Sequence, residues 1–123
     1  MKKPNLSSMS LDELVDRFAE IGVQQDDALW DGKYAKFGAL YKQMDQIDSE
    51  LKLRGTDARR ALLRLYTHPN IQVRLKAAVR TLAVAPEVAR RALEAIANSR
   101  LYPQAGDAGM CLSNLDDGTF KPD

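Results

Sequence analysis

The residues best suited to covalent chemistry are His68 and Cys111, each the one residue of its type in the chain. Nucleophilic catalysis needs a nucleophile within hydrogen-bond reach of a base that a third group orients. His68 stands directly before Pro69, where we expect the imidazole to pack or to bond locally. Cys111 falls in an expected helix, and a free cysteine behaves there as a small buried side chain. We therefore expect neither residue to be a catalyst, and we expect the protein not to be an enzyme.

Metal chemistry has equally little support in the sequence. One histidine and one cysteine are too few for a tetrahedral zinc site. Asp26 with Asp27 and Asp45 with Asp48 are the closest carboxylate groupings, but no glycine-rich phosphate-binding loop accompanies them. We predict that these carboxylates are solvated and that the protein carries no metal and no cofactor.

The most prominent chemical feature is a basic middle section. Residues 54–100 contain ten Lys or Arg against three Asp or Glu, whereas residues 1–53 have seven against ten and residues 101–123 have one against four. Basic residues four positions apart share a face of a helix. The candidate binding face consists of Arg60, Arg64, Arg74, Lys76 and Arg80. The same charges are alternatively solvated, or paired with the acidic first section.

Two further motifs have alternative interpretations. Trp30 lies beside an expected interhelical turn, where it either plugs a hairpin or anchors a partner. Gly106 and Gly109 match the GxxG loop that clamps backbone phosphates in an RNA-binding module. Asp107 between them would repel phosphate, so we expect the glycines to allow the close approach of a neighbouring helix.

The elements that must position these residues begin with a helical hairpin. Ser10 and Glu13 form a capping box, after which apolar residues recur at helical spacing to about residue 25 or 29. A turn signal at 31–32 separates this helix from a second one, which Gly55 ends. Aromatic residues of the second helix share the apolar spacing, and we assign them to the core: Tyr34, Phe37 and Tyr41.

Four shorter helices are predicted to follow. Asp57 and Asn70 are expected to cap the third and the fourth helix. Pro69 ends the third helix, and Pro86 and Pro103 suit the beginnings of the fifth and sixth. The predicted core is continuous and contains Leu14, Phe18, Phe37, Leu51, Leu62, Leu65, Leu75, Ala78, Leu82, Leu93, Ile96 and Leu115.

An internal repeat suggests how these helices stack. The letters ARRAL at 58–62 recur at 89–93, and a proline follows each copy. Repeated helical hairpins bury their apolar faces against their neighbours. We therefore predict an all-α fold, a short right-handed α-α superhelix of HEAT/armadillo-like type with six helices in three stacked hairpins. The chain would be a single domain over 1–123, with a flexible start at 1–9, hairpins at 10–54, 56–84 and 86–116, and a tail at 117–123.

Several segments along nearly the whole chain match a known family. They are Leu14 to Phe18, Ile47 to Leu51, His68-Pro69 with Val73 to Ala78, Leu82 to Pro86, and Gln104 to Met110. With these segments the chain resembles a bacterial family known as domain of unknown function two thousand and nineteen. The resemblance implies a fold similar to HEAT-type superhelices, and it implies no activity, cofactor or binding residue.

These features favour a non-enzymatic macromolecular interaction module that binds a protein partner through its basic face. An acidic partner would suit the arginines. A nucleic-acid-binding HEAT-like protein is the alternative, although the net charge is only +1 and no aromatic residues alternate with the basic ones. An immunity-type inhibitor of a toxin is a further alternative. No apolar run is long enough to cross a bilayer, and one unpaired cysteine suits a reducing compartment, so we expect a cytoplasmic protein with no membrane partner.

Overall fold

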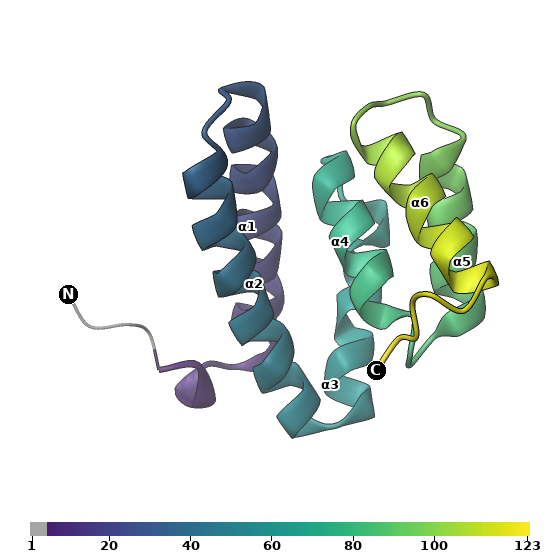
Figure 1. Cartoon of the computed structure of the whole chain (residues 1–123). Helices are drawn as coiled ribbons and strands as arrows, with labels where there is room; N and C mark the ends of the chain where they lie inside the picture. The colour runs from purple at the N-terminus through teal and green to yellow at the C-terminus, as the bar shows by residue number, and fades with distance from the viewer. Residues whose placement is uncertain (1–4) are drawn as a thin grey trace. The chain divides into compact units, whose positions relative to one another are not determined.

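The computed structural model describes residues 5–123, so residues 1–4 of the predicted flexible start lie outside it. Within the described residues the fold is all-α, with six α-helices, two 3-10 helices and no strand (Figure 1). The elements are η1 (Leu6–Ser8), α1 (Leu11–Trp30), α2 (Tyr34–Arg54), α3 (Thr56–Arg60), η2 (Ala61–Thr67), α4 (Ile71–Thr81), α5 (Pro86–Ala97) and α6 (Gln104–Asp116). This confirms the predicted fold class and helix number, whereas the stacking into a right-handed superhelix stays a prediction.

The chain folds as two compact units, one ending at Ala61 and the other comprising Leu62–Asp123. In the first unit, α1 and α2 run antiparallel and form the predicted hairpin (Figure 1). The capping box is confirmed, because Ser10 Oγ accepts from the Glu13 amide at 3.1 Å and Glu13 Oε1 accepts from the Ser10 amide at 3.0 Å. Fully buried side chains of both helices make the core of this hairpin: Leu14, Phe18, Ile21, Met44, Ile47 and Leu51.

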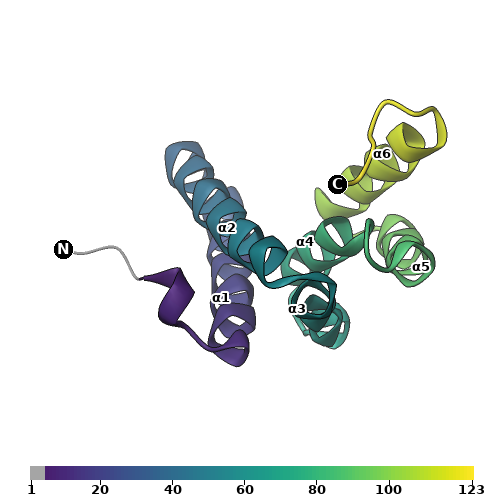
Figure 2. The ribbon, with the colours of Figure 1, turned by 90° about the horizontal axis from the view of Figure 1, so that it is seen from below.

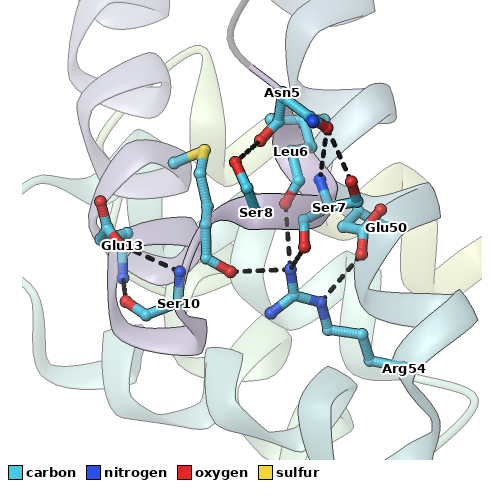
Figure 3. Close-up of polar contacts among 9 residues, drawn as sticks. Asn5, Leu6, Ser7, Ser8, Ser10, Glu13, Glu50 and Arg54 are labelled. Atoms are coloured by element: carbon cyan, nitrogen blue, oxygen red, sulfur yellow. Dashed lines mark hydrogen bonds and ion pairs between the residues drawn. The ribbon is translucent and has the colours of Figure 1, made fainter.

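The start of the described chain is bonded to the end of α2. The Nη2 atom of Arg54, at the end of α2, donates to the carbonyl oxygens of Leu6 at 3.0 Å and Met9 at 2.7 Å (Figure 3). It also lies 3.4 Å from the Ser7 carbonyl, while Nε donates to Glu50 Oε2 at 2.8 Å. Residues 5–9 therefore have defined contacts with α2, because one guanidinium has enough donors to bind several carbonyls at once, and the flexible start stays a prediction.

The third helix differs from its prediction. Gly55, with φ +105°, is its N-cap and no side chain caps it, so the predicted role of Asp57 is wrong. Regular α-helix lasts only to Arg60, and the chain continues as 3-10 helix to Thr67. The copy of the ARRAL segment at 89–93 lies instead within the regular helix α5. Identical letters thus form different local structures, because contacts outside the segment outweigh its intrinsic propensity.

In the second unit, α4 packs against α5 and α6 (Figure 2). Asn70 caps α4 as predicted, since its Oδ1 accepts from the amides of Gln72 and Val73. The core of this unit consists of Leu75, Ala78, Leu82, Ala89, Leu93, Ile96 and Ala108. Phe120 of the tail packs against the same cluster. Of the twelve predicted core residues, Phe37 and Leu115 are partly exposed and the other ten are buried.

Polar contacts also connect the helices of the second unit. Gln104 Nε2 of α6 donates to Gln72 Oε1 of α4 at 3.0 Å, and both side chains are buried. Arg90 of α5 binds Asp116 at the end of α6 through two parallel hydrogen bonds of 2.9 and 3.1 Å. The guanidinium lowers the pKa of Asp116. Among the described residues, no helix is both long and apolar enough to cross a membrane.

Candidate functional site

The end of the α1–α2 hairpin presents two large aromatic side chains to solvent. Trp30 closes α1 and is 78% exposed, and Tyr34 opens α2 and is 73% exposed. The interpretation of Trp30 as a hairpin plug is therefore wrong. The assignment of Tyr34 and Tyr41 to the core is also wrong, because Tyr41 is 42% exposed and Phe37 is only partly buried.

Helix geometry explains these exposures. Trp30 follows the buried Ala28 by two residues, which turns it about 200° away from the core side of α1. Tyr34 and Tyr41 lie about 100° around α2 from Leu40, which packs in the core. The exposure of Trp30 could thus have been predicted from the sequence, because its position does not fit the helical spacing of the buried residues of α1.

The turn between the two aromatic residues is well ordered by hydrogen bonds. Gly32 adopts a positive φ of +69°. Its amide donates to the Leu29 carbonyl at 3.3 Å, and the Lys33 amide donates to the Ala28 carbonyl at 2.8 Å. This pair of bonds is the Schellman motif, which satisfies the last carbonyls of a helix. Trp30 is therefore presented from a turn of defined geometry.

The five residues of the candidate basic face are distributed over three elements, α3, η2 and α4. Arg60 ends α3 in the first unit, whereas the other four belong to the second unit. Within α4, Lys76 and Arg80 share one side, but Arg74 lies about 200° around the helix from Lys76. Arg64 is exposed on η2.

Each of these five side chains also interacts within the protein. Arg60, Arg64, Lys76 and Arg80 each take part in an intramolecular interaction. Arg74 Nη1 donates to the His68 carbonyl at 2.8 Å and to the Pro69 carbonyl at 3.3 Å. The sequence located the basic residues but could not indicate these contacts, which depend on the fold.

The two residues considered for nucleophilic chemistry have other roles. His68 Nδ1 accepts a hydrogen bond from the Asn70 amide at 3.0 Å, so the imidazole bonds locally as expected. Cys111 is half-buried against the core of the second unit. Burial raises the pKa of its thiol, although Lys76 nearby opposes part of this shift. A raised pKa keeps the less nucleophilic thiol form at neutral pH.

The carboxylates do not form a metal site within the described residues, where no group of three or more potential ligands occurs. The prediction that they are solvated is wrong for Asp48, which is only 3% exposed on α2. Its Oδ2 lies 3.8 Å from Lys52 Nζ one turn later. Asp48 therefore belongs to the packing of α2 rather than to a solvated acidic patch.

The glycines of α6 do not contact a neighbouring helix. A Cβ atom added to Gly106 would lie 3.8 Å from the ring of Tyr102, and one added to Gly109 would have no atom within 4 Å. The close-approach interpretation is therefore wrong. Both glycines lie within a regular helix rather than in a phosphate-binding loop.

The described part of the chain is thus a small all-α protein with exposed aromatic residues and with basic side chains spread over several helices. Residues 12–116 match the family described as Domain of unknown function (DUF2019), and the chain belongs to this family. The crystal structure of the protein RPA1889 from Rhodopseudomonas palustris CGA009 is similar, with 55% sequence identity and a TM-score of 0.94. The match covers 98% of this chain and 100% of that one. A comparison with curated proteins gives no match.

Proposed function

We propose that the protein is a non-enzymatic module that binds another protein, with Trp30 and Tyr34 as its main contact residues. The observation that carries the proposal is the exposure of both rings on a hydrogen-bonded turn. Tryptophan and tyrosine dominate the binding energy of many protein interfaces. Their rings offer a large contact area and lose little conformational entropy on binding, since each has two side-chain torsions.

The charges beside the aromatic residues favour a protein partner over a nucleic acid. Asp27 and Asp31 flank Trp30, and both are exposed. Carboxylates at this position would repel phosphates that approach the indole. Lys33 and Lys36 lie just beyond the turn, so the surface carries both signs of charge. A mixed, partly apolar surface of this kind is typical of protein interfaces.

The five residues of the candidate basic face would form a second region of contact with the partner protein. Their support is the surplus of Lys and Arg over Asp and Glu in residues 54–100, which would attract an acidic surface of the partner. The proposal places the protein in the cytoplasm, where a half-buried thiol such as Cys111 stays reduced. The locally bonded His68 and the raised pKa of Cys111 support the absence of catalysis.

The test is affinity capture from the native cell with mass spectrometry as readout. The baits are the wild type, the double variant Trp30→Ala/Tyr34→Ala, and Leu53→Ala as a matched control. Leu53 is 84% exposed on the same hairpin, so its replacement removes a similarly exposed apolar side chain elsewhere. We expect a protein that is captured by the wild type and by Leu53→Ala, and is lost with the double variant.

A separate bait tests the basic region. Arg80→Glu reverses one charge of α4, and its helical content is checked by circular dichroism because Arg80 interacts within the chain. If the partner is lost with Arg80→Glu but retained by the double variant Trp30→Ala/Tyr34→Ala, the contact surface lies on α4 rather than at the end of the hairpin. Retention of every captured protein by both variants would contradict the proposal.

A further inference from the structure

A small half-open cavity lies in the second unit between η2, α4 and α5. Its volume is about 140 Å³. Helix α5 forms its floor with Ala92, Ala95 and Ile96, whose spacing of three and four residues puts them on one face of the helix, and Ser99 lines the cavity just after the helix ends. The two alanines leave space that larger side chains would fill, and most of the lining is therefore apolar.

Among the described residues that line this cavity, Arg74 is the one that carries a charge. Its Nη1 is fixed by the carbonyls of His68 and Pro69. The other donors, on Nε and Nη2, make no hydrogen bond within residues 5–123. A guanidinium held by one nitrogen, with the remaining donors in a planar fork, is suited to bind a carboxylate.

The other polar groups around the cavity are already used. The hydroxyl of Tyr66 is bonded to Thr81 Oγ1, which donates to the Ala77 carbonyl at 2.8 Å. Ser99 Oγ donates to the Ile96 carbonyl at 2.6 Å and accepts from the Leu101 amide at 3.2 Å. Arg74 is therefore the group that would select the charge of a ligand.

No carboxylate lines the cavity to repel an anion. Glu94, which is on the same helix as the floor, lies 3.7 Å from Arg90 on the side away from Arg74. Arg91 adds a further positive charge on α5 without lining the cavity. The electrostatic environment of the cavity thus favours a negative ligand.

We propose that this cavity binds a carboxylate carried on a small apolar group, with Arg74 on the charge and the floor of α5 on the apolar part. A cavity of about 150 Å³ holds one benzene molecule in another protein, which sets the size of the apolar group. The carboxylate belongs either to a free small acid or to the C-terminus of a protein chain. The site goes beyond the proposed function, since it is in the other unit from Trp30.

The test is an NMR titration of the full chain with benzoate and with benzamide, its neutral analogue. We expect saturable shifts of the Ala92, Ala95 and Ile96 methyl signals and of the Arg74 Nε–H signal. Benzoate should bind about tenfold more tightly than benzamide, because an affinity ratio of this size corresponds to the usual contribution of a hydrogen bond to a charged group. An acetylated Gly-Gly-Phe peptide, with a free or an amidated C-terminus, distinguishes the two sources. Tighter binding of the free peptide than of benzoate identifies a chain terminus, and the reverse order identifies a free acid.

Three variants complete the test. Arg74→Gln should weaken benzoate binding about tenfold, whereas Arg91→Gln, a nearby arginine outside the cavity, should change it little. Ala92→Leu fills the cavity and retains Arg74, so it should abolish binding even if Arg74→Gln perturbs the turn at Pro69. Equal affinities for benzoate and benzamide, equal losses in the two arginine variants, or no saturable shift with any probe would overturn the proposal.

Discussion

A single arginine accounts for the order of the first described residues. Arg54 is three-quarters buried and bonds the carbonyls of Leu6 and Met9 together with the carboxylate of Glu50 (Figure 3). These carbonyls precede α1. The carbonyl of Leu6 also accepts from the Met9 amide within the N-terminal turn, and the guanidinium satisfies oxygen lone pairs that would otherwise need water. The contact also fixes where the chain enters α1.

Replacing Arg54 by alanine should therefore destabilise the protein by about 1–3 kcal/mol, the usual cost of losing hydrogen bonds to a charged group. The amides of Ser8 and Met9, which bond within the N-terminal turn, should exchange faster with solvent. Urea unfolding and hydrogen exchange measure the two effects. Arg91→Ala is the control, because Arg91 is exposed on α5 and replacing a surface residue of this kind usually changes stability by about 0.5 kcal/mol or less. Equal losses in both variants would refute this role of Arg54.

The capping box makes one contribution to stability dependent on pH. Hydrogen bonds from Ser10 lower the pKa of Glu13 below its ordinary value of 4.5. A carboxyl whose pKa is lower in the folded state stabilises the fold above the unfolded pKa, and the effect disappears as the pH falls through the folded value. The stability difference between the wild type and Glu13→Gln, which replaces the carboxylate by a neutral amide, should thus shrink below pH 4.5. Urea unfolding at a series of acidic pH values tests this, and a constant difference would contradict it.

At the scale of helices, local signals predicted where α1 and α4 begin, but they predicted the boundaries of α3 and the buried faces less well. Ser10 with Glu13 and Asn70 act over three residues, and both caps occur where the sequence indicates them. In α2, however, the stripe through Tyr34 and Tyr41 has the same period as the stripe through the buried core residues. Periodicity shows that an apolar face exists but does not show which of two faces another helix covers.

The contacts of the basic residues were less predictable, because they depend on the fold. The sequence identifies basic residues, but whether a guanidinium bonds a distant carbonyl or faces solvent depends on elements far along the chain. Arg54 lies 45 residues after Met9, which it contacts. The start of the 3-10 segment likewise has no distinct signal, since the letters ARRAL that lead into it at 58–62 form regular helix in α5.

Helix α4 offers the clearest test of the core. Leu75 is 2% exposed and belongs to the cluster with Leu93 and Ile96. Truncation leaves a cavity in a close-packed region, so Leu75→Ala should destabilise the protein by about 2–5 kcal/mol. Thermal and urea unfolding provide the measurement. Val88→Ala is the control on α5. Because Val88 is 40% exposed, this substitution should lower the free energy of unfolding much less than Leu75→Ala does. A negligible effect of Leu75→Ala would mean that α4 is oriented differently.

At the scale of the whole molecule, the balance of charge argues against binding to nucleic acid. The net charge of +1 reflects nearly equal numbers of basic and acidic residues. Phosphate binding requires several lysines or arginines that are available to displace counterions. We expect no mobility shift of a short duplex or single strand at moderate salt. A shift that persists at moderate salt and disappears with Arg80→Glu would instead support the nucleic-acid alternative.

The exposure of Trp30 has a practical consequence for optical work. The chain contains one tryptophan, and its indole is surrounded mainly by water in the folded state. Its emission should therefore lie at long wavelength both before and after unfolding, so intrinsic fluorescence is a poor monitor of denaturation in this protein. A partner that covers the hairpin end would shield the indole from water and shift its emission to shorter wavelength. The same residue thus supplies a built-in, label-free signal for occupancy of that surface.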